Sequence, residues 1–335
     1  MKRKLIALFV LSSTCSAYAQ TAPEAAMKKL RDSMTMVYLS EFAKRQPMLR
    51  QGGISYDVSS NTNSKMLAED GTLLYQGDME ISRMKMNFNL PISSWGKNRL
   101  NGAVVYQKQH YAFGQNFNAG VPSQPGSLDR ASVGLSATYS RSDSLFNRPV
   151  IYSAGITAFS NELNSIRRLS YSGTMIFPLK QQANTMTNVG VVLAIGPNGV
   201  LPVPFFSYWH RFNSKLEFDL QLPYGASFRI PFSTAAWATF GTALDPNFSF
   251  LSKSNPNAPA NLTHNMLDLK TGLSLEHMLG KKLVAGVRGG LVSNLSSRVQ
   301  KDNADVNDYL LKMKRGTVPF VNFSLSFLPF LKSIR

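Results

Sequence analysis

Apolar and polar residues alternate along most of the chain from Gly53 onward. In the stretch Lys215–Pro223, leucine or phenylalanine takes every second position, and Glu217, Asp219 and Gln221 lie between them. Successive side chains of a β-strand point to opposite faces, so this stretch has one apolar and one polar face. The same period of two recurs at 83–90, 131–140, 189–195, 267–276 and 321–327. Alternation sustained over this length predicts an all-β, antiparallel protein.

The segment that precedes these strands has a different pattern. Between Ala25 and Arg45, apolar side chains recur near helical spacing, with basic residues among the other positions. The apolar residues are Met27, Leu30, Met34, Val37 and Phe42. We therefore expect a short amphipathic helix here, although the run TMVYL in its middle is also compatible with a strand.

The connections between the predicted strands alternate in length. Short polar turns are predicted at Ser93–Asn98, Arg141–Pro149, Lys180–Thr185, Asn213-Ser214, Ser233-Thr234 and Leu279–Lys281. Longer loops are predicted at Asn63–Gly77, Gly114–Leu128, Ser160–Arg167, Gly196–Val203, Asp245–Leu262 and Asn294–Arg315. Short turns at one end and long loops at the other are typical of a transmembrane antiparallel up-and-down β-barrel, with periplasmic turns and extracellular loops.

The strand number depends on one hairpin. If Pro223-Tyr224-Gly225 is a tight outer turn, the barrel has fourteen strands. If Ala226–Pro231 forms no strand, the number falls to twelve, because membrane barrels favour even counts. The main rival fold is a soluble periplasmic β-sandwich, in which the apolar faces would form a core.

Aromatic residues lie close to several predicted turns. They are Trp95, Trp209, Phe212, Phe232 and Trp237. In a membrane barrel such residues form a girdle at the interface, whereas in a soluble sandwich they would cap the core.

The first nineteen residues have the features of a signal peptide. Lysine and arginine occupy positions 2–4, Leu5–Leu11 is apolar, and Ala17-Tyr18-Ala19 fits a cleavage site. Cleavage would remove Cys15, the only cysteine, so we expect neither a disulfide nor a thiolate site in the mature protein. The predicted domains are a signal peptide at 1–19, an N-terminal periplasmic or plug segment at 20–52, and an outer-membrane barrel at 53–335.

The chain is strongly basic. Its net charge is +17, with 36 lysines and arginines against 19 aspartates and glutamates. The basic residues are spread along the sequence and form no compact block with interleaved aromatics, which argues against a nucleic-acid partner. The excess fits lipopolysaccharide phosphates or anionic solutes, or simply a solubilising surface.

The polar faces of the predicted strands carry charged residues of both signs. If the apolar faces meet lipid, these residues point into the barrel, where salt bridges and water satisfy them. The candidate lumen-lining residues are Arg83, Lys85, Glu217, Asp219, Asp268, Lys270, Glu276 and Arg288.

Catalytic motifs are absent from the sequence. There is no Gly-x-Ser-x-Gly, no His-Glu-x-x-His, and no EF-hand or zinc spacing, so we expect no catalytic residue, cofactor or metal. His110 and His264 fall near the predicted outer end, and a lipid hydrolase would need a serine within hydrogen-bond reach of one of them.

Two stretches carry a resemblance to known proteins. Residues 202–223, PVPFFSYWHRFNSKLEFDLQLP, resemble the Pro-rich entry, aromatic strand, short turn and leucine-alternating strand of uncharacterised outer-membrane β-barrel families of Gram-negative bacteria. Residues 317–330, TVPFVNFSLSFLPF, resemble the closing strand that the barrel-insertion machinery recognises, although the tail 331–335 departs from that pattern.

The resemblance implies a location in the outer membrane, among lipid and lipopolysaccharide. The leading functional hypothesis is a porin-like passive channel or transporter of small anionic or apolar solutes. The alternatives are a structural or adhesion barrel without transport and, third, an outer-membrane lipid hydrolase.

Overall fold

The computed structural model describes residues 34, 36–37, 39–116, 126–161, 165–196, 199–212, 215–251, 261–302, 304 and 308–331. The chain divides into two units, Met1–Leu49 and Arg50–Arg335. In the first unit the described residues between positions 34 and 45 are helical, and the 3-10 turn η1 (Pro47–Leu49) follows. The short helix predicted near the N-terminus is therefore confirmed over this part. The expected signal peptide lies outside the described residues.

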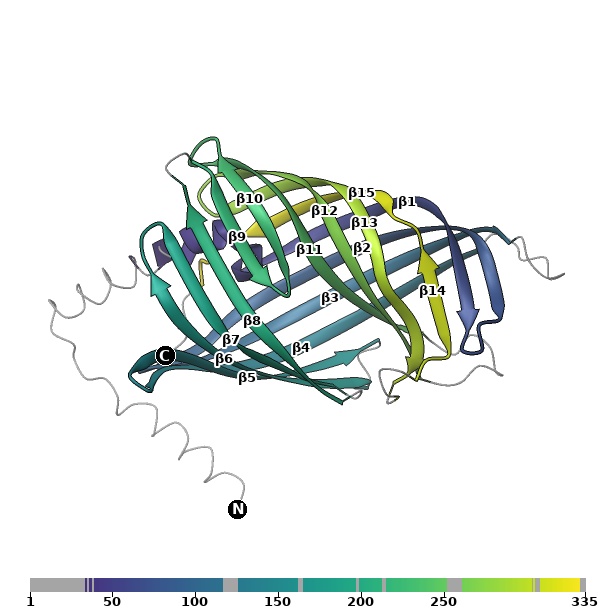
Figure 1. Ribbon diagram of the computed structural model, residues 1–335, viewed down its shortest axis with the longest axis horizontal. Helices are drawn as coiled ribbons and strands as arrows, with labels where there is room; N and C mark the ends of the chain where they lie inside the picture. Colours follow the sequence, from purple (N-terminus) through teal and green to yellow (C-terminus); the bar gives the residue numbers. More distant parts are fainter. Residues whose placement is uncertain are drawn as a thin grey trace, which may run out of the picture. The chain divides into compact units, whose positions relative to one another are not determined.

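The second unit consists of β-strands joined in chain order (Figure 1). The strands are β1 (Gly52–Ala68), β2 (Leu73–Trp95), β3 (Asn98–Asn116), β4 (Gly126–Leu145), β5 (Arg148–Ser160), β6 (Arg168–Gln181), β7 (Thr185–Gly196), β8 (Gly199–Arg211), β9 (Glu217–Leu222), β10 (Gly225–Pro231), β11 (Ala236–Leu251), β12 (Leu262–Leu279), β13 (Leu283–Lys301), β14 (Leu311–Arg315) and β15 (Val318–Phe327).

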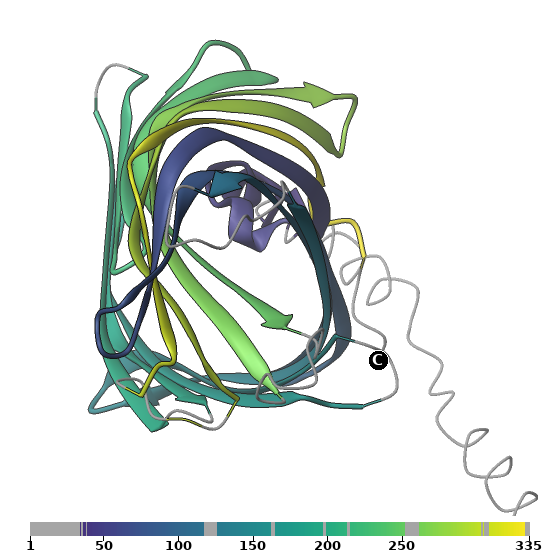
Figure 2. The same ribbon diagram turned by 90° about the vertical axis from the view of Figure 1, so that its right-hand side faces the viewer.

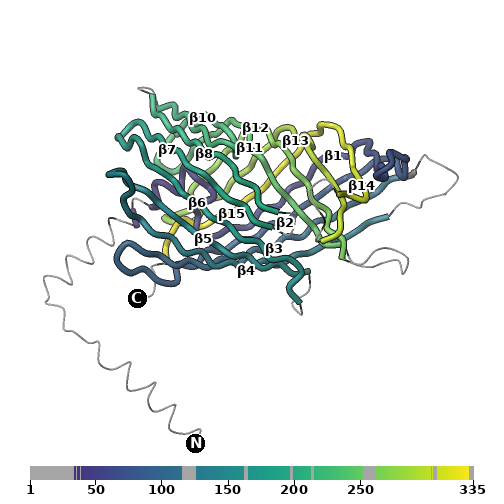
Figure 3. The backbone as a smooth tube through the Cα atoms, turned by 60° about the horizontal axis from the view of Figure 1, so that its bottom comes forward, coloured from purple at the N-terminus to yellow at the C-terminus, as the bar shows by residue number. Residues whose placement is uncertain are grey.

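Each strand pairs antiparallel with its neighbours, and the sheet closes on itself. The wall runs from β1 in sequence order to β13, and β13 returns to β1 through β14 and β15. Both short strands pair with β13 on one side and β1 on the other, so together they fill one position in the wall. Figure 2 views the closed ring from one end, and Figure 3 shows the strands side by side around it.

The wall therefore has fourteen strand positions, as the sequence predicted. The turn at residues 223–224 exists, and β10 is a real strand of seven residues. A closed barrel also rules out the two-layer sandwich that the sequence had left open.

The two faces of the wall differ in polarity, and the apolar face is outside. Side chains such as Tyr56, Leu135 and Phe323 are exposed by 46%, 58% and 55%. On the opposite face Asp57 and Gln109 are almost completely buried, at 7% and 1%. An apolar outer surface with buried charges suits a lipid environment. A barrel closed on itself also leaves no unpaired strand edge exposed to lipid.

Several sequence-based details were wrong. The predicted long loops are shorter than expected: β1 runs on to Ala68 and β11 to Leu251, both inside segments that had been predicted as loops. Trp209 and Trp237 are 5% and 1% exposed and lie inside the barrel, so they belong to no interfacial girdle. Trp95, Phe212 and Phe232 are exposed, as the girdle requires, by 49%, 42% and 61%.

The short hairpin β9–β10 changes the course of its neighbour. The pairing of β10 with β11 ends at Ala243, so the rest of β11, to Leu251, pairs only with β12. Side chains on both faces of this end of β11 are buried: Asn247, Ser249 and Phe250 are 4%, 2% and 1% exposed. Figure 2 shows the corresponding green ends of β11 and β12 inside the ring. The hairpin β11–β12 thus narrows the interior at this level.

Candidate functional site in the barrel interior

Six charged side chains form a cluster inside the barrel, referred to below as the ionic cluster. It consists of Asp57, Arg83, Lys85, Asp245, Asp268 and Lys270. The Arg83 guanidinium lies 2.7 Å from the Asp268 carboxylate, and the Lys85 ammonium lies 2.5 Å from Asp245. Lys270 bridges two acids, 2.9 Å from Asp57 and 2.8 Å from Asp245. With three cations and three carboxylates, the cluster is balanced in charge.

Three of the four pairs of the ionic cluster join strands that are not neighbours in the wall, and only Lys270 and Asp245 lie on adjacent strands, β12 and β11. Arg83 is on β2 and Asp268 on β12, and the positions of β1, β14/β15 and β13 lie between them. Only inward-pointing side chains can meet in this way. Side-chain amides also donate hydrogen bonds to two of the carboxylates: Asn322 donates to Asp57 over 2.9 Å, and Asn294 donates to Asp268 over 2.8 Å.

Four of the eight residues expected to line the lumen, Arg83, Lys85, Asp268 and Lys270, are thus brought together. Arg288 lies beside them and donates to the carbonyl oxygens of Lys270, over 3.0 Å, and Gly241, over 3.4 Å. Asp57 and Asp245 were missed. Asp57 lies on a strand whose alternation could have identified it, whereas Asp245 had been assigned to a loop.

Glu217 and Asp219, from the leucine-alternating stretch, lie apart from the ionic cluster. Glu217 is 2% exposed and pairs with Arg211 at 2.7 Å and Arg229 at 3.1 Å. Asp219 accepts from Gln221 over 3.3 Å. On the same strand Leu222 is 47% exposed, so the polar face of this stretch points inward and its end leucine outward.

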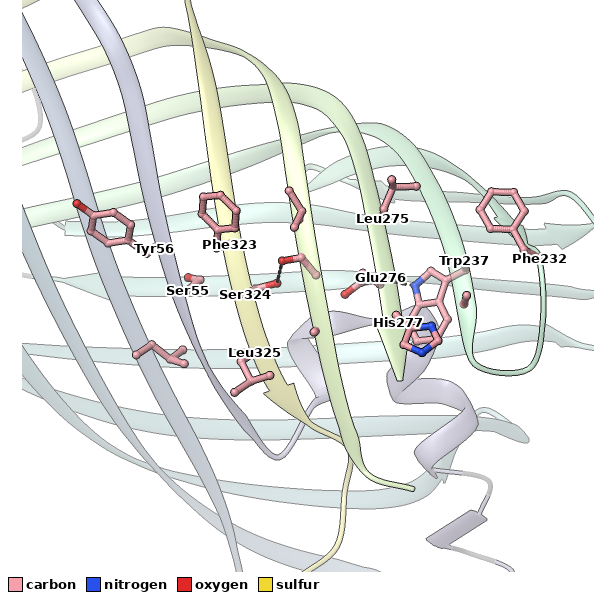
Figure 4. Close-up of a pocket in the computed structure, with 15 residues that line it drawn as sticks. Ser55, Tyr56, Phe232, Trp237, Leu275, Glu276, His277, Phe323, Ser324 and Leu325 are labelled. Atoms are coloured by element: carbon pink, nitrogen blue, oxygen red, sulfur yellow. Dashed lines mark hydrogen bonds between the residues drawn. The ribbon is translucent and has the colours of Figure 1, made fainter. Parts of the chain in front are cut away.

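Glu276 belongs to a separate group near the short turns. Its two carboxylate oxygens accept from Arg50, over 2.6 Å, and from the indole Nε1 of Trp237, over 2.7 Å. Trp237 and Glu276 lie side by side in Figure 4, a close-up of a pocket in this part of the wall. The volume of this pocket is about 730 Å³. Since both oxygens are engaged, Glu276 fixes the positions of these neighbouring side chains.

Beyond the ionic cluster, contacts across the interior involve the inward end of β11. The Phe248 ring packs edge-on against Phe159 of β5, with centroids 4.7 Å apart. The Phe248 carbonyl accepts from Gln109 of β3 over 2.9 Å. A Cβ on Gly134 would lie 2.5 Å from the Phe159 ring, so glycine provides the space that this ring occupies. These contacts, where the inward end of β11 meets β3 and β5, are called the constriction below.

A histidine and a serine meet inside the barrel, but without the surroundings of a hydrolase. His264 Nε2 lies 2.7 Å from Ser297 Oγ, and Nδ1 lies 3.3 Å from the Tyr111 hydroxyl. Both His264 and Ser297 are at most 3% exposed, and the partner of Nδ1 is a phenol where a triad has a carboxylate. His110 lies 3.0 Å from Asp129 near the loop end.

Neither a metal site nor a spanning helix is found in the described part of the chain. No group of three or more His, Cys, Asp or Glu residues there could hold a metal ion. No helix among the described residues is both long and apolar enough to cross a membrane.

The fold and the interior together define a membrane-type β-barrel, apolar outside and charged inside. No family model and no curated protein sequence matches the chain. Among solved structures, an outer membrane channel from Pseudomonas putida F1 is similar with TM-score 0.38 and 8% identity, covering 82% of this chain and 94% of that one. The P. putida toluene transporter TodX is similar with TM-score 0.32 and 11% identity, covering 84% of this chain and 90% of that one. The translocator domain of the Neisseria meningitidis autotransporter NalP has TM-score 0.29 and 8% identity, with coverages of 94% and 100%.

Proposed function

We propose that the protein is a porin-like channel of the Gram-negative outer membrane that passes small solutes passively. The observation that carries the proposal is the ionic cluster. Apolar side chains in the interior would stabilise the barrel at least as well, since buried ion pairs contribute little net stability. Stability alone therefore does not explain the ionic cluster. Charged groups that meet across the interior suit a water-containing path, in which they select what passes.

The same proposal covers location and partners. The outward apolar face would contact lipid, and the basic residues at the loop end would contact lipopolysaccharide phosphates. The last strand, β15, would be recognised by the barrel-insertion machinery. Residues 1–19 would direct export and be cleaved.

Ion conduction should be measurable when the purified barrel is inserted into a planar lipid bilayer. We expect small single-channel steps, because the β11–β12 ends occupy part of the interior. In a salt gradient the reversal potential should show a modest preference for anions: the ionic cluster is balanced, and Arg288 adds a cation whose side chain donates to backbone carbonyls. A barrel that inserts and remains silent would contradict the channel and favour the structural or adhesion alternative.

Phe248→Ala should raise the conductance by widening the constriction. The substitution removes the ring that packs on Phe159, while the backbone carbonyl that accepts from Gln109 stays in place. Single-channel recording gives the result directly. The matched control is Phe240→Ala on the same strand, where the ring is 56% exposed on the outside and should not affect the current. Equal conductance of both variants would show that ions do not pass the constriction.

A further inference from the structure

A second cavity lies inside the barrel, and its lining is apolar. Its volume is about 120 Å³. Its walls come from seven strands, β1, β3, β4, β11, β12, β13 and β14, near the strand ends at Ala68, Asn116, Gly126, Leu251, Leu262, Lys301 and Leu311. The cavity is thus built from both the outer ring and the β11–β12 hairpin inside it.

Methionine and aromatic side chains supply much of this lining. Met66 and Met313 line the cavity together with Tyr111 and Phe113, whose ring centroids are 6.5 Å apart with an angle of 12° between the planes. Behind them Met79, Ile81 and Met266 form a buried cluster with Tyr111 and Met313. Thioethers are polarisable and adapt to irregular shapes, and they make favourable contacts with aromatic rings.

The polar atoms at the edge of the cavity are already satisfied by one another. The Tyr111 hydroxyl lies 2.5 Å from Gln109 Oε1 and 3.3 Å from both Ser249 and His264. The remaining nitrogen of His264 is engaged with Ser297 at 2.7 Å. A bound water needs two to four free polar partners, which this arrangement does not offer.

From these observations we infer that the cavity binds a small apolar molecule of about the size of benzene. An engineered apolar cavity of roughly 150 Å³ in another protein stays dry and takes up benzene or xenon. The present cavity is of the same order and has aromatic and thioether walls. A hydroxyl or a carboxylate on the ligand would find no free partner and would lose its hydration, so polar analogues are rejected.

The position of the cavity gives the site a role in passage. Met266 belongs to the cluster behind the cavity, and its sulfur lies 3.7 Å from an Arg83 nitrogen. A molecule that enters from the loop end would therefore bind in the apolar cavity before it reaches the ionic cluster. This inference rests on the proposed channel for the passage of the ligand, but not for its binding.

The test uses the full-length barrel, crystallised and exposed to xenon under pressure. Xenon density is expected in the cavity of the wild type and should be lost in Leu128→Trp, whose larger side chain fills the space. Val299→Phe fills the cavity from another strand if the first variant does not fold. Leu295→Trp is the matched control, because Leu295 is 55% exposed on the outside and should leave the xenon site intact.

A measurement in solution tests whether the ligand must be apolar. The ¹⁹F resonance of fluorobenzene should show saturable binding to the detergent-solubilised wild type, at least tenfold weaker in the filled variants, and 4-fluorobenzoate should show none. An empty cavity under xenon, or fluorobenzene binding that the filled variants retain, would overturn the inference. Planar-bilayer conductance of the same samples reports separately on the channel, so either proposal can fail while the other stands.

Discussion

Replacing Asp268 by asparagine is expected to destabilise the folded barrel by roughly 3–5 kcal/mol, the usual cost of removing one partner from a buried ion pair. Asp268 and Arg83 have side chains that are only 2% and 5% exposed. Asparagine keeps the volume and can still accept from Asn294, so the variant isolates the loss of charge. Among the described residues, Arg83 would retain only Asp245, at 3.9 Å, as a carboxylate partner. Urea unfolding in phospholipid vesicles measures the change.

Two controls show whether an unpaired charge is the cause. The double variant Arg83→Met/Asp268→Leu should recover most of the loss, because replacing a whole buried pair by apolar groups is often close to neutral. Asp143→Asn removes a carboxylate from ion pairs with the exposed Lys97 and Arg141, and should leave the urea midpoint unchanged. If Asp268→Asn also leaves the midpoint unchanged, the Arg83–Asp268 pair contributes nothing measurable to stability.

The period-two pattern was sufficient to predict the barrel because lipid outside and polar groups inside impose alternation on every strand. The number of strands followed from the turn chemistry, including the tight turn at residues 223–224. What the pattern could not predict is where each strand ends. The end of β11 is buried on both faces, and the end of β1 has no regular burial alternation, so in both segments the period of two is lost and the sequence resembles a loop.

The membership of the ionic cluster was only partly predictable for the same reason. Alternation placed Arg83 and Lys85 on one face of β2, and Asp268 and Lys270 on one face of β12. It could not show that these faces meet, because the meeting depends on closure of the ring and on the inward course of the β11–β12 hairpin. Asp245 was misread because Asp-Pro-Asn is a turn-forming sequence, yet the register between β11 and β12 continues unbroken to Leu251.

The buried tryptophans illustrate a further limit. Trp209 and Trp237 lie near turns, where an interfacial aromatic is expected, but both point inward. Inside the barrel, Arg211 lies over the Trp209 ring at 5.5 Å and Arg229 over the Trp237 ring at 4.8 Å. A cation over an aromatic face is a favourable contact both at exposed sites and, more strongly, where water is excluded. Distance from a turn does not reveal which face a side chain takes, so sequence alone could not separate these residues from the girdle.

Leu273→Arg should destabilise the barrel by roughly 2–4 kcal/mol, as arginine does on the lipid face of a barrel near the bilayer midplane. Leu273 is 49% exposed and lies opposite Phe240 of β11, which is 56% exposed, so both belong to the outward apolar band. An arginine there must either leave its guanidinium in hydrocarbon or deform the bilayer around it. Folding equilibria of wild type and variant in phospholipid vesicles give the difference in free energy.

The same substitution at a second depth makes this a test of the membrane rather than of the side chain. Leu279 is also 49% exposed but precedes the turn at Gly280, so Leu279→Arg can extend its charge into water and should cost only about 0–1 kcal/mol. Leu273→Ala controls for the lost leucine. On a protein surrounded by water, a substitution at such an exposed position changes stability by no more than about 0.5 kcal/mol. Equal, small effects at both depths would therefore mean that the apolar band does not face lipid, and the channel proposal would lose its physical basis.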